Sequence, residues 1–167
     1  MIPSRRQFIK TGIAGSLLLS FCGWLNAAGA RRLSNSEREM LGALCNAMLE
    51  GALPRDHEQR RQQVALTVDG IAVEVAGLPL AAQKEIGELF GLLVLAPARF
   101  MLAGVGKPWR EASVAEVGEF LQSWRASRLN LLQTAYGALH DLTFGAWYAR
   151  PETWDAIGYP GPPKGYF

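Results

Sequence analysis

Two histidines, His57 and His140, are the side chains of this sequence best suited to acid–base or metal chemistry. His57 lies in the charged stretch 55–61, where we expect it to be solvated. His140 lies at the edge of the apolar stripe of a predicted helix and is followed by Asp141. Neighbouring side chains on a helix point about 100° apart, so we do not expect these two to form a catalytic pair. The sequence has no H-x-x-x-H or H-x-x-E spacing, so we expect no metal site.

Cysteine and phosphate-binding chemistry are equally sparse. Cys45 is surrounded by apolar residues of the same predicted helix and is expected to be a small buried side chain. There is no G-x-G-x-x-G loop and no C-x-x-C-H haem attachment motif. We therefore predict no catalytic residue, no bound cofactor and no metal in this chain.

The clearest motif is at the N-terminus, where a polar residue precedes two arginines, a phenylalanine, an aliphatic residue and a lysine. This pattern, spanning residues 4–10, matches the twin-arginine export consensus, and its defining side chains are Arg5, Arg6, Phe8 and Lys10. An apolar stretch, 12–25, follows without a polar face. The motif predicts export of a folded chain, and hence a periplasmic location.

The segment after the apolar stretch offers a peptidase site. Ala28-Gly29-Ala30 has the A-x-A form, so we expect cleavage near Ala30. Two alternatives remain: retention of residues 1–30 as a membrane anchor, and lipidation of Cys22, which the preceding Phe21 disfavours. We predict a signal peptide over residues 1–30 and one domain over residues 31–167.

The net charge supports this division. The chain has 167 residues and a formal charge of +2. Arg5, Arg6 and Lys10 supply three positive charges of the signal segment, which contains no acid, so the remainder carries about −1. The apparent basicity therefore belongs to export, and we expect no nucleic-acid partner.

The remainder of the chain is predicted to be helical. Apolar residues recur at helical spacing in five segments, approximately 34–50, 64–77, 79–95, 113–125 and 128–148. The second segment is rich in Val and Ile, so a strand over 65–76 is the alternative, although its length favours a helix. We predict an all-α, small irregular bundle of about five helices with an extended C-terminal tail rich in aromatic residues, proline and glycine.

Sequence signals also mark where these helices start. Ser34 with Glu37, and Ser113 with Glu116, have the spacing of capping boxes. Residues 103–110, with two glycines and a proline, are expected to form a loop that holds Trp109.

The last predicted helix has two faces. Its core stripe is expected to run through Leu129, Leu132, Tyr136 and Leu139, widened by neighbouring leucines and alanines. The opposite face, which includes Phe144 and Tyr148, is aromatic, and the tail adds further aromatic residues. One interpretation is a partner interface; the other is that the N-terminal helix or the tail covers this face within the domain. The candidate interface residues are Phe144, Trp147, Tyr148, Trp154, Tyr159 and Pro160.

The C-terminal residues 144–163, F-G-A-W-Y-A-R-P followed by E-T-W-D-A-I-G-Y-P-G-P-P, resemble the ending of the gluconate 2-dehydrogenase subunit 3 family. The twin-arginine start and the helix opening at Leu33-Ser34 are also similar to this family, whereas the middle of the chain agrees in helical character only. Family members are small subunits of sugar and alcohol dehydrogenases.

The resemblance implies a large FAD-dependent partner of the glucose-methanol-choline oxidoreductase type, and in some complexes a multihaem cytochrome c with haem c. It implies that this chain is non-catalytic and assists folding and twin-arginine export of the flavoprotein, with the twin-arginine translocase as a further partner. Two other hypotheses are a self-sufficient periplasmic enzyme and an independent periplasmic helical ligand-binding protein, with Trp109, Trp124 and Trp147 lining a pocket.

Overall fold

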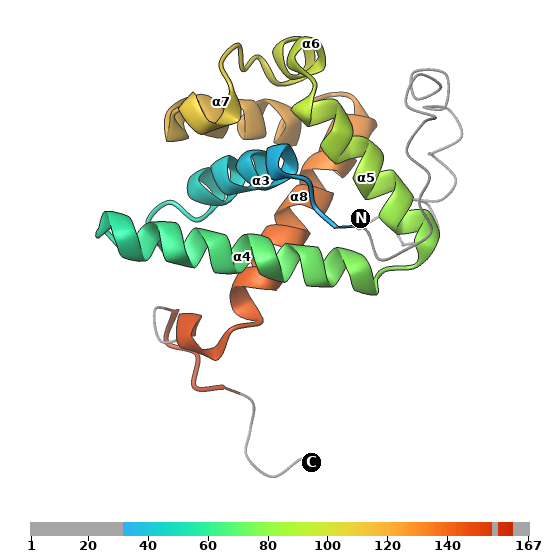
Figure 1. Ribbon diagram of the computed structural model, residues 1–167. Helices are drawn as coiled ribbons and strands as arrows, with labels where there is room; N and C mark the ends of the chain where they lie inside the picture. Colours follow the sequence, from blue (N-terminus) through green and yellow to red (C-terminus); the bar gives the residue numbers. More distant parts are fainter. Residues whose placement is uncertain (1–31, 155–156, 162–167) are drawn as a thin grey trace.

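A computed structural model describes residues 32–154 and 157–161 of the chain. The described residues form an all-α bundle without strands, as the sequence predicts (Figure 1). Its long helices are α3 (Asn35–Met48), α4 (His57–Gly77), α5 (Leu80–Val94), α7 (Val114–Arg125) and α8 (Asn130–Tyr148). These five helices correspond to the five predicted segments.

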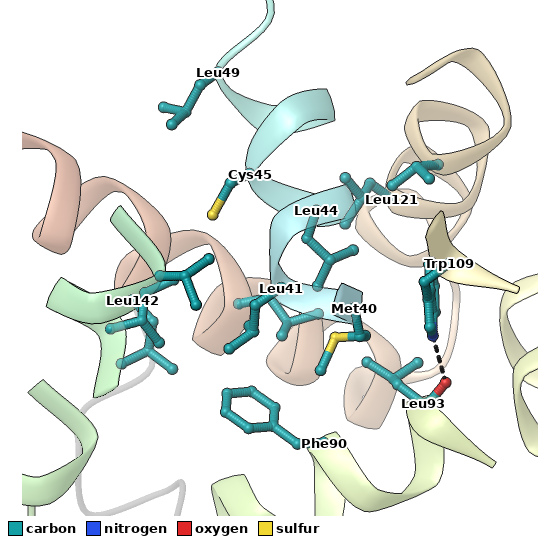
Figure 2. Close-up of a cluster of buried hydrophobic side chains, with 14 of the residues drawn as sticks. Met40, Leu41, Leu44, Cys45, Leu49, Phe90, Leu93, Trp109, Leu121 and Leu142 are labelled. Carbon is teal, nitrogen blue, oxygen red and sulfur yellow. Dashed lines mark hydrogen bonds between the residues drawn. The ribbon is translucent and has the colours of Figure 1, made fainter. Parts of the chain in front are cut away.

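Helix α3 is the centre of the bundle and packs against α4, α5, α7 and α8 (Figure 1). The predicted capping box starts it: Ser34 Oγ accepts from the Glu37 backbone N–H at 3.3 Å, and a Glu37 carboxylate oxygen accepts from the Ser34 N–H at 2.8 Å. Apolar side chains on the inner face of α3 are almost completely buried between the surrounding helices: Met40, Leu41, Leu44 and Cys45 (Figure 2). Burial of these side chains supplies the main driving force for folding.

Helix α4 settles the choice between helix and strand for the second segment. It is a continuous helix, and it begins at His57, a full two turns before the apolar stripe that starts at Val64. The early start has a local cause, because the side chain of Asp56 accepts a hydrogen bond from the Gln59 N–H at 2.9 Å and caps the helix. The charged residues therefore form the exposed first turns of α4 rather than a separate segment.

The chain between α5 and the predicted loop at 103–110 forms short helical turns, and irregular backbone follows over residues 104–108. The chain bends by 82° between Leu80–Val94 and Ala96–Ala103. The second part consists of the short helix α6 (Ala96–Ala98) and a π-helical turn, η1 (Arg99–Ala103), which ends at Gly104 with a positive φ of 68°. No single helix in the described part of the chain is long and apolar enough to cross a membrane, whereas this bent pair together meets that length and composition.

Helix α8 buries a different set of residues from the predicted core stripe. Leu129 and Leu131 are exposed, and Leu132 and Tyr136 are only partly buried. Burial is concentrated in the second half of α8 because that half crosses α4, where Ala146 lies against Gly70. The buried residues of α8 are Leu139, Leu142, Thr143, Ala146 and Trp147.

Because of the second capping box, the free energy of unfolding is expected to change with pH in the acidic range. Hydrogen bonds from the backbone N–H and hydroxyl of Ser113, and then from Lys107, lower the pKa of Glu116 from 4.5 to about 2. Ionised Glu116 therefore stabilises the folded chain above pH 4.5, and this contribution is lost as the pH falls towards 2.

We expect Glu116→Ala to lower the free energy of unfolding at pH 7. The difference from wild type should shrink as the pH is lowered from 4.5 towards 2. Urea unfolding at several pH values measures it, with Glu119→Ala on the same helix as the control; a difference independent of pH would contradict the assignment.

Candidate partner-binding surface

Four aromatic rings lie in a row along one side of α8. Consecutive ring centroids are 5.9 Å apart for Tyr136 and His140, 4.5 Å for His140 and Phe144, and 6.0 Å for Phe144 and Tyr148. The row follows an i, i+4 spacing, which places side chains one above another on a helix. None of these rings is fully buried, and Tyr148 is exposed. We call these four residues the aromatic ladder.

The ladder contains two of the predicted interface residues, Phe144 and Tyr148. The sequence interpretation missed the other two, because Tyr136 was assigned to the core stripe and His140 to its edge. The four-residue spacing of Tyr136, His140, Phe144 and Tyr148 was a signal that could have found the whole row.

His140 also contacts its neighbour in the sequence. Its Nδ1 atom lies 3.2 Å from a carboxylate oxygen of Asp141. This contact does not test the expectation that the two form no catalytic pair, which stays a prediction. The two are exposed, so their pairing contributes little to stability.

Trp147 does not belong to this surface. Its side chain is only 4% exposed and lies in the core, which corrects the prediction that it forms part of an interface. The guanidinium of Arg150 lies 4.9 Å from the Trp147 ring and donates hydrogen bonds to Gln63 and Thr67 on α4 at 2.8 and 3.2 Å. These contacts hold the end of α8 against α4, and the Trp147 ring is buried at this contact.

The first part of the tail folds back against the end of α8 instead of extending away from it. A 3₁₀ turn, η3 (Pro151–Thr153), leads to Trp154, whose indole N–H donates to the Tyr148 carbonyl at 2.8 Å. The rings of Trp154 and Tyr159 then meet edge to face at 5.2 Å. Tyr159 and Pro160 remain exposed beside them. The tail therefore extends the aromatic surface past Tyr148 without covering the ladder's last ring.

A carboxylate also lies against α8 near this surface. A Cβ atom placed on Gly145 would lie 2.8 Å from a carboxylate oxygen of Glu74 on α4, so this carboxylate rests directly on the α8 backbone. Burial raises the pKa of Glu74 above its ordinary value. A partly buried acid of α4 thus lies against α8 at Gly145, the residue after Phe144.

The thiol of Cys45 is structural, as the sequence predicts. Burial raises the pKa of Cys45 to about 12, although a hydrogen bond with Thr143 and the positive charge of Arg150 oppose this shift. A thiol with so high a pKa is protonated at neutral pH and is a poor nucleophile.

The three tryptophans of the hypothesised pocket, Trp109, Trp124 and Trp147, are buried in the core. Trp109 and Trp124 are buried on either side of Phe120, with ring centroids at 6.0 and 4.8 Å from it. An open groove of about 620 Å³ lies on α3 and α4. Basic side chains dominate its rim: Arg38, Arg55, His57, Arg60 and Arg61. Three of these arginines already pair with acids, namely Arg38 with Asp69, Arg60 with Glu50, and Arg61 with Glu58.

The residues of the predicted export signal, Arg5, Arg6, Phe8 and Lys10, lie outside the described residues. Within the described ranges, no group of three His, Cys, Asp or Glu side chains could hold a metal ion. Comparisons of the chain with protein-family models, curated proteins and solved structures found no match. The fold and site thus define an all-α bundle that presents an aromatic surface at the end of its last helix.

Proposed function

We propose that this chain is the non-catalytic small subunit of a periplasmic FAD-dependent dehydrogenase complex. The large subunit would be a flavoprotein of the glucose-methanol-choline type that oxidises a sugar, a sugar acid or another alcohol. The small subunit would assist its folding and its export through the twin-arginine translocase. FAD would belong to the large subunit, and haem c to a third subunit where one is present.

The observation that carries this proposal is the aromatic ladder with its adjoining tail. Tyrosine and other aromatic side chains are enriched in the buried centres of protein interfaces, where large rings bury much apolar area at a low entropic cost. The ladder rings contact one another in order along α8, and each keeps part of its surface in solvent, although Tyr136 and Phe144 also pack against the core. The same C-terminal segment carries the resemblance to dehydrogenase small subunits, which supports assigning the surface to that partner.

Export supplies a second, independent line of support. A flavoprotein must fold around FAD before it leaves the cytoplasm, and the twin-arginine route carries folded cargo. A signal on a tightly bound small subunit would therefore serve both chains. Such a stable complex should bury well over about 1,600 Å² of surface.

Co-purification with a flavoprotein of this class from the same genome tests the interface. We expect Phe144→Ser combined with Tyr148→Ser to reduce recovery of the yellow complex strongly, because interface aromatics can each contribute about 2 kcal/mol or more to binding. The measurement is the ratio of bound FAD to small subunit after affinity purification.

The matched control is Val73→Ser on α4, because Val73 is 73% exposed and lies outside the ladder. Circular dichroism should show both variants to be as helical as wild type. Full retention of FAD by the ladder variant would remove this surface from the interface, and a colourless, folded wild-type chain that ignores the flavoprotein would refute the proposed function.

The groove on α3 and α4 favours a second candidate, an independent periplasmic ligand-binding protein. Its apolar floor, which includes Val64 and Val68, and its basic rim would suit an anionic molecule with an apolar part. Equilibrium binding to the isolated chain, compared between wild type and Arg55→Ala, distinguishes this candidate from the small-subunit role.

A further inference from the structure

The turn that follows α5 holds a compact group of apolar side chains in solvent. Phe100 and Met101 are 64% and 81% exposed, and Leu95 and Leu102 are also exposed. They belong to α6, η1 and the residue before them, which lie at one extremity of the molecule (Figure 1). We call residues 95–102 the apolar tip.

The apolar tip presents no charged side chain to the surroundings. Arg99 is the only charged residue between Leu89 and Gly106. Its side chain turns inward, where it is 9% exposed and its Nε donates to the Val105 carbonyl at 3.1 Å. The Arg99 guanidinium, the one charged group of the tip, would be costly to transfer into an apolar medium. It is instead buried within the domain and hydrogen-bonded.

Two buried tryptophans hold the apolar tip in this position. The indole N–H of Trp109 donates to the Leu93 carbonyl at 2.8 Å, just before the tip (Figure 2). The indole N–H of Trp124 donates to the Leu102 carbonyl, also at 2.8 Å, at its end. These bonds satisfy backbone carbonyls at the two ends of the tip, before the bend and at the end of η1. The apolar side chains are thus presented to solvent from an anchored backbone.

The surroundings of the tip favour a lipid surface. The first charged residues after it, Lys107 and Arg110, are basic and exposed, and their ion pairs with Glu116 and Glu111 are exposed and weak. Basic side chains flanking an apolar protrusion suit the anionic headgroups that lie above the hydrocarbon region of a bilayer. A protrusion at the edge of the molecule with no exposed charge can enter a fluid bilayer, whereas a protein partner would have to provide a pocket of matching shape.

We propose that the apolar tip inserts into the interfacial region of a phospholipid bilayer. The side chains of Phe100, Met101 and Leu102 enter the acyl-chain boundary, while Lys107 and Arg110 stay at the headgroups. The bent segment that carries the tip has the length and composition of a membrane segment, although its 82° bend shapes it for shallow insertion rather than for a straight crossing. This attachment requires neither the signal segment nor the flavoprotein.

An environment-sensitive fluorophore at the tip tests the proposal in the full chain. Met101→Cys, made together with Cys22→Ser, provides a reactive thiol at an exposed position, and buried Cys45 stays unlabelled. Vesicles of phosphatidylethanolamine and phosphatidylglycerol, with and without brominated acyl chains, are the probe. We expect a blue shift of the fluorophore and its quenching by the brominated chains. Adding Phe100→Ser and Leu102→Ser should weaken this response at least about tenfold.

A label at Val73→Cys is the matched control, because Val73 is similarly exposed. It belongs to α4, which lies across the bundle from α6 (Figure 1). Since the apolar signal segment brings the full chain to vesicles in either case, only a response confined to position 101 supports insertion of the tip. Equal quenching at both positions, or none at position 101, would overturn the proposal. Burial of the label by the purified flavoprotein in the absence of lipid would assign the tip to a protein interface instead.

Discussion

Cells in which Arg5→Lys and Arg6→Lys are combined in this chain are expected to keep the dehydrogenase activity of the partner flavoprotein in the cytoplasm. The substitutions preserve the positive charge of the segment, so they test recognition of the arginine pair rather than charge alone. Because the flavoprotein is expected to have no signal of its own, it should be retained together with the small subunit. Activity measured in periplasmic and cytoplasmic fractions should show the loss of most of the periplasmic share while total activity is maintained.

The corresponding control replaces Lys10 by Arg, which keeps both the charge and the arginine pair. Export should then continue. If the doubly substituted chain stays in the cytoplasm while the flavoprotein still reaches the periplasm, the escort role is wrong, even if the two chains form a complex.

Gly70→Ala is expected to destabilise the domain by about 1–3 kcal/mol, because it forces a methyl group into the closest approach of α4 and α8. A Cβ atom at Gly70 would lie 2.9 Å from the Cβ of Ala146 and 3.5 Å from its Cα. Both helices are held at this crossing by buried residues on either side, such as Ile71 and Trp147, so neither can move away freely. Chemical denaturation gives the change in the free energy of unfolding.

Two further variants make this prediction specific. Gly91→Ala on α5 has open space around its new methyl group and should be neutral or stabilising by up to about 1 kcal/mol, as expected from helix propensity. Combining Gly70→Ala with Ala146→Gly moves the methyl group across the contact and should recover most of the lost stability. If the double variant is no more stable than Gly70→Ala alone, the contact between residues 70 and 146 does not limit helix packing.

Local sequence signals predicted the helices well because their causes are local. The capping boxes at Ser34 and Ser113 join a side chain to a backbone N–H three residues away, so their effect does not depend on the rest of the fold. The apolar spacing around α3 likewise predicted its buried face, including Cys45. The start of α4 was missed because the cap by Asp56 was not recognised in a charged segment.

The candidate surface was predictable only in part. Phe144 and Tyr148 were identified from their position on the last helix, and both lie in the aromatic ladder. Trp147 was assigned to the interface from its aromatic character, but Arg150 and the packing of α8 on α4 place it in the core. The aromatic character of a side chain predicts that its apolar surface will be buried. It does not predict whether the domain's own core or a partner protein buries that surface.

By itself, the sequence determined the all-α character of the described residues and the limits of most of their helices, because these depend on hydrophobic periodicity and on contacts a few residues apart. The tertiary structure alone decided which side of α8 is buried, since α4 crosses its second half at Gly70 and leaves Leu129 and Leu131 in solvent. It also decided that Arg99 turns inward while Phe100 and Met101 point outward. These outcomes depend on contacts between residues distant in sequence, which local periodicity does not encode.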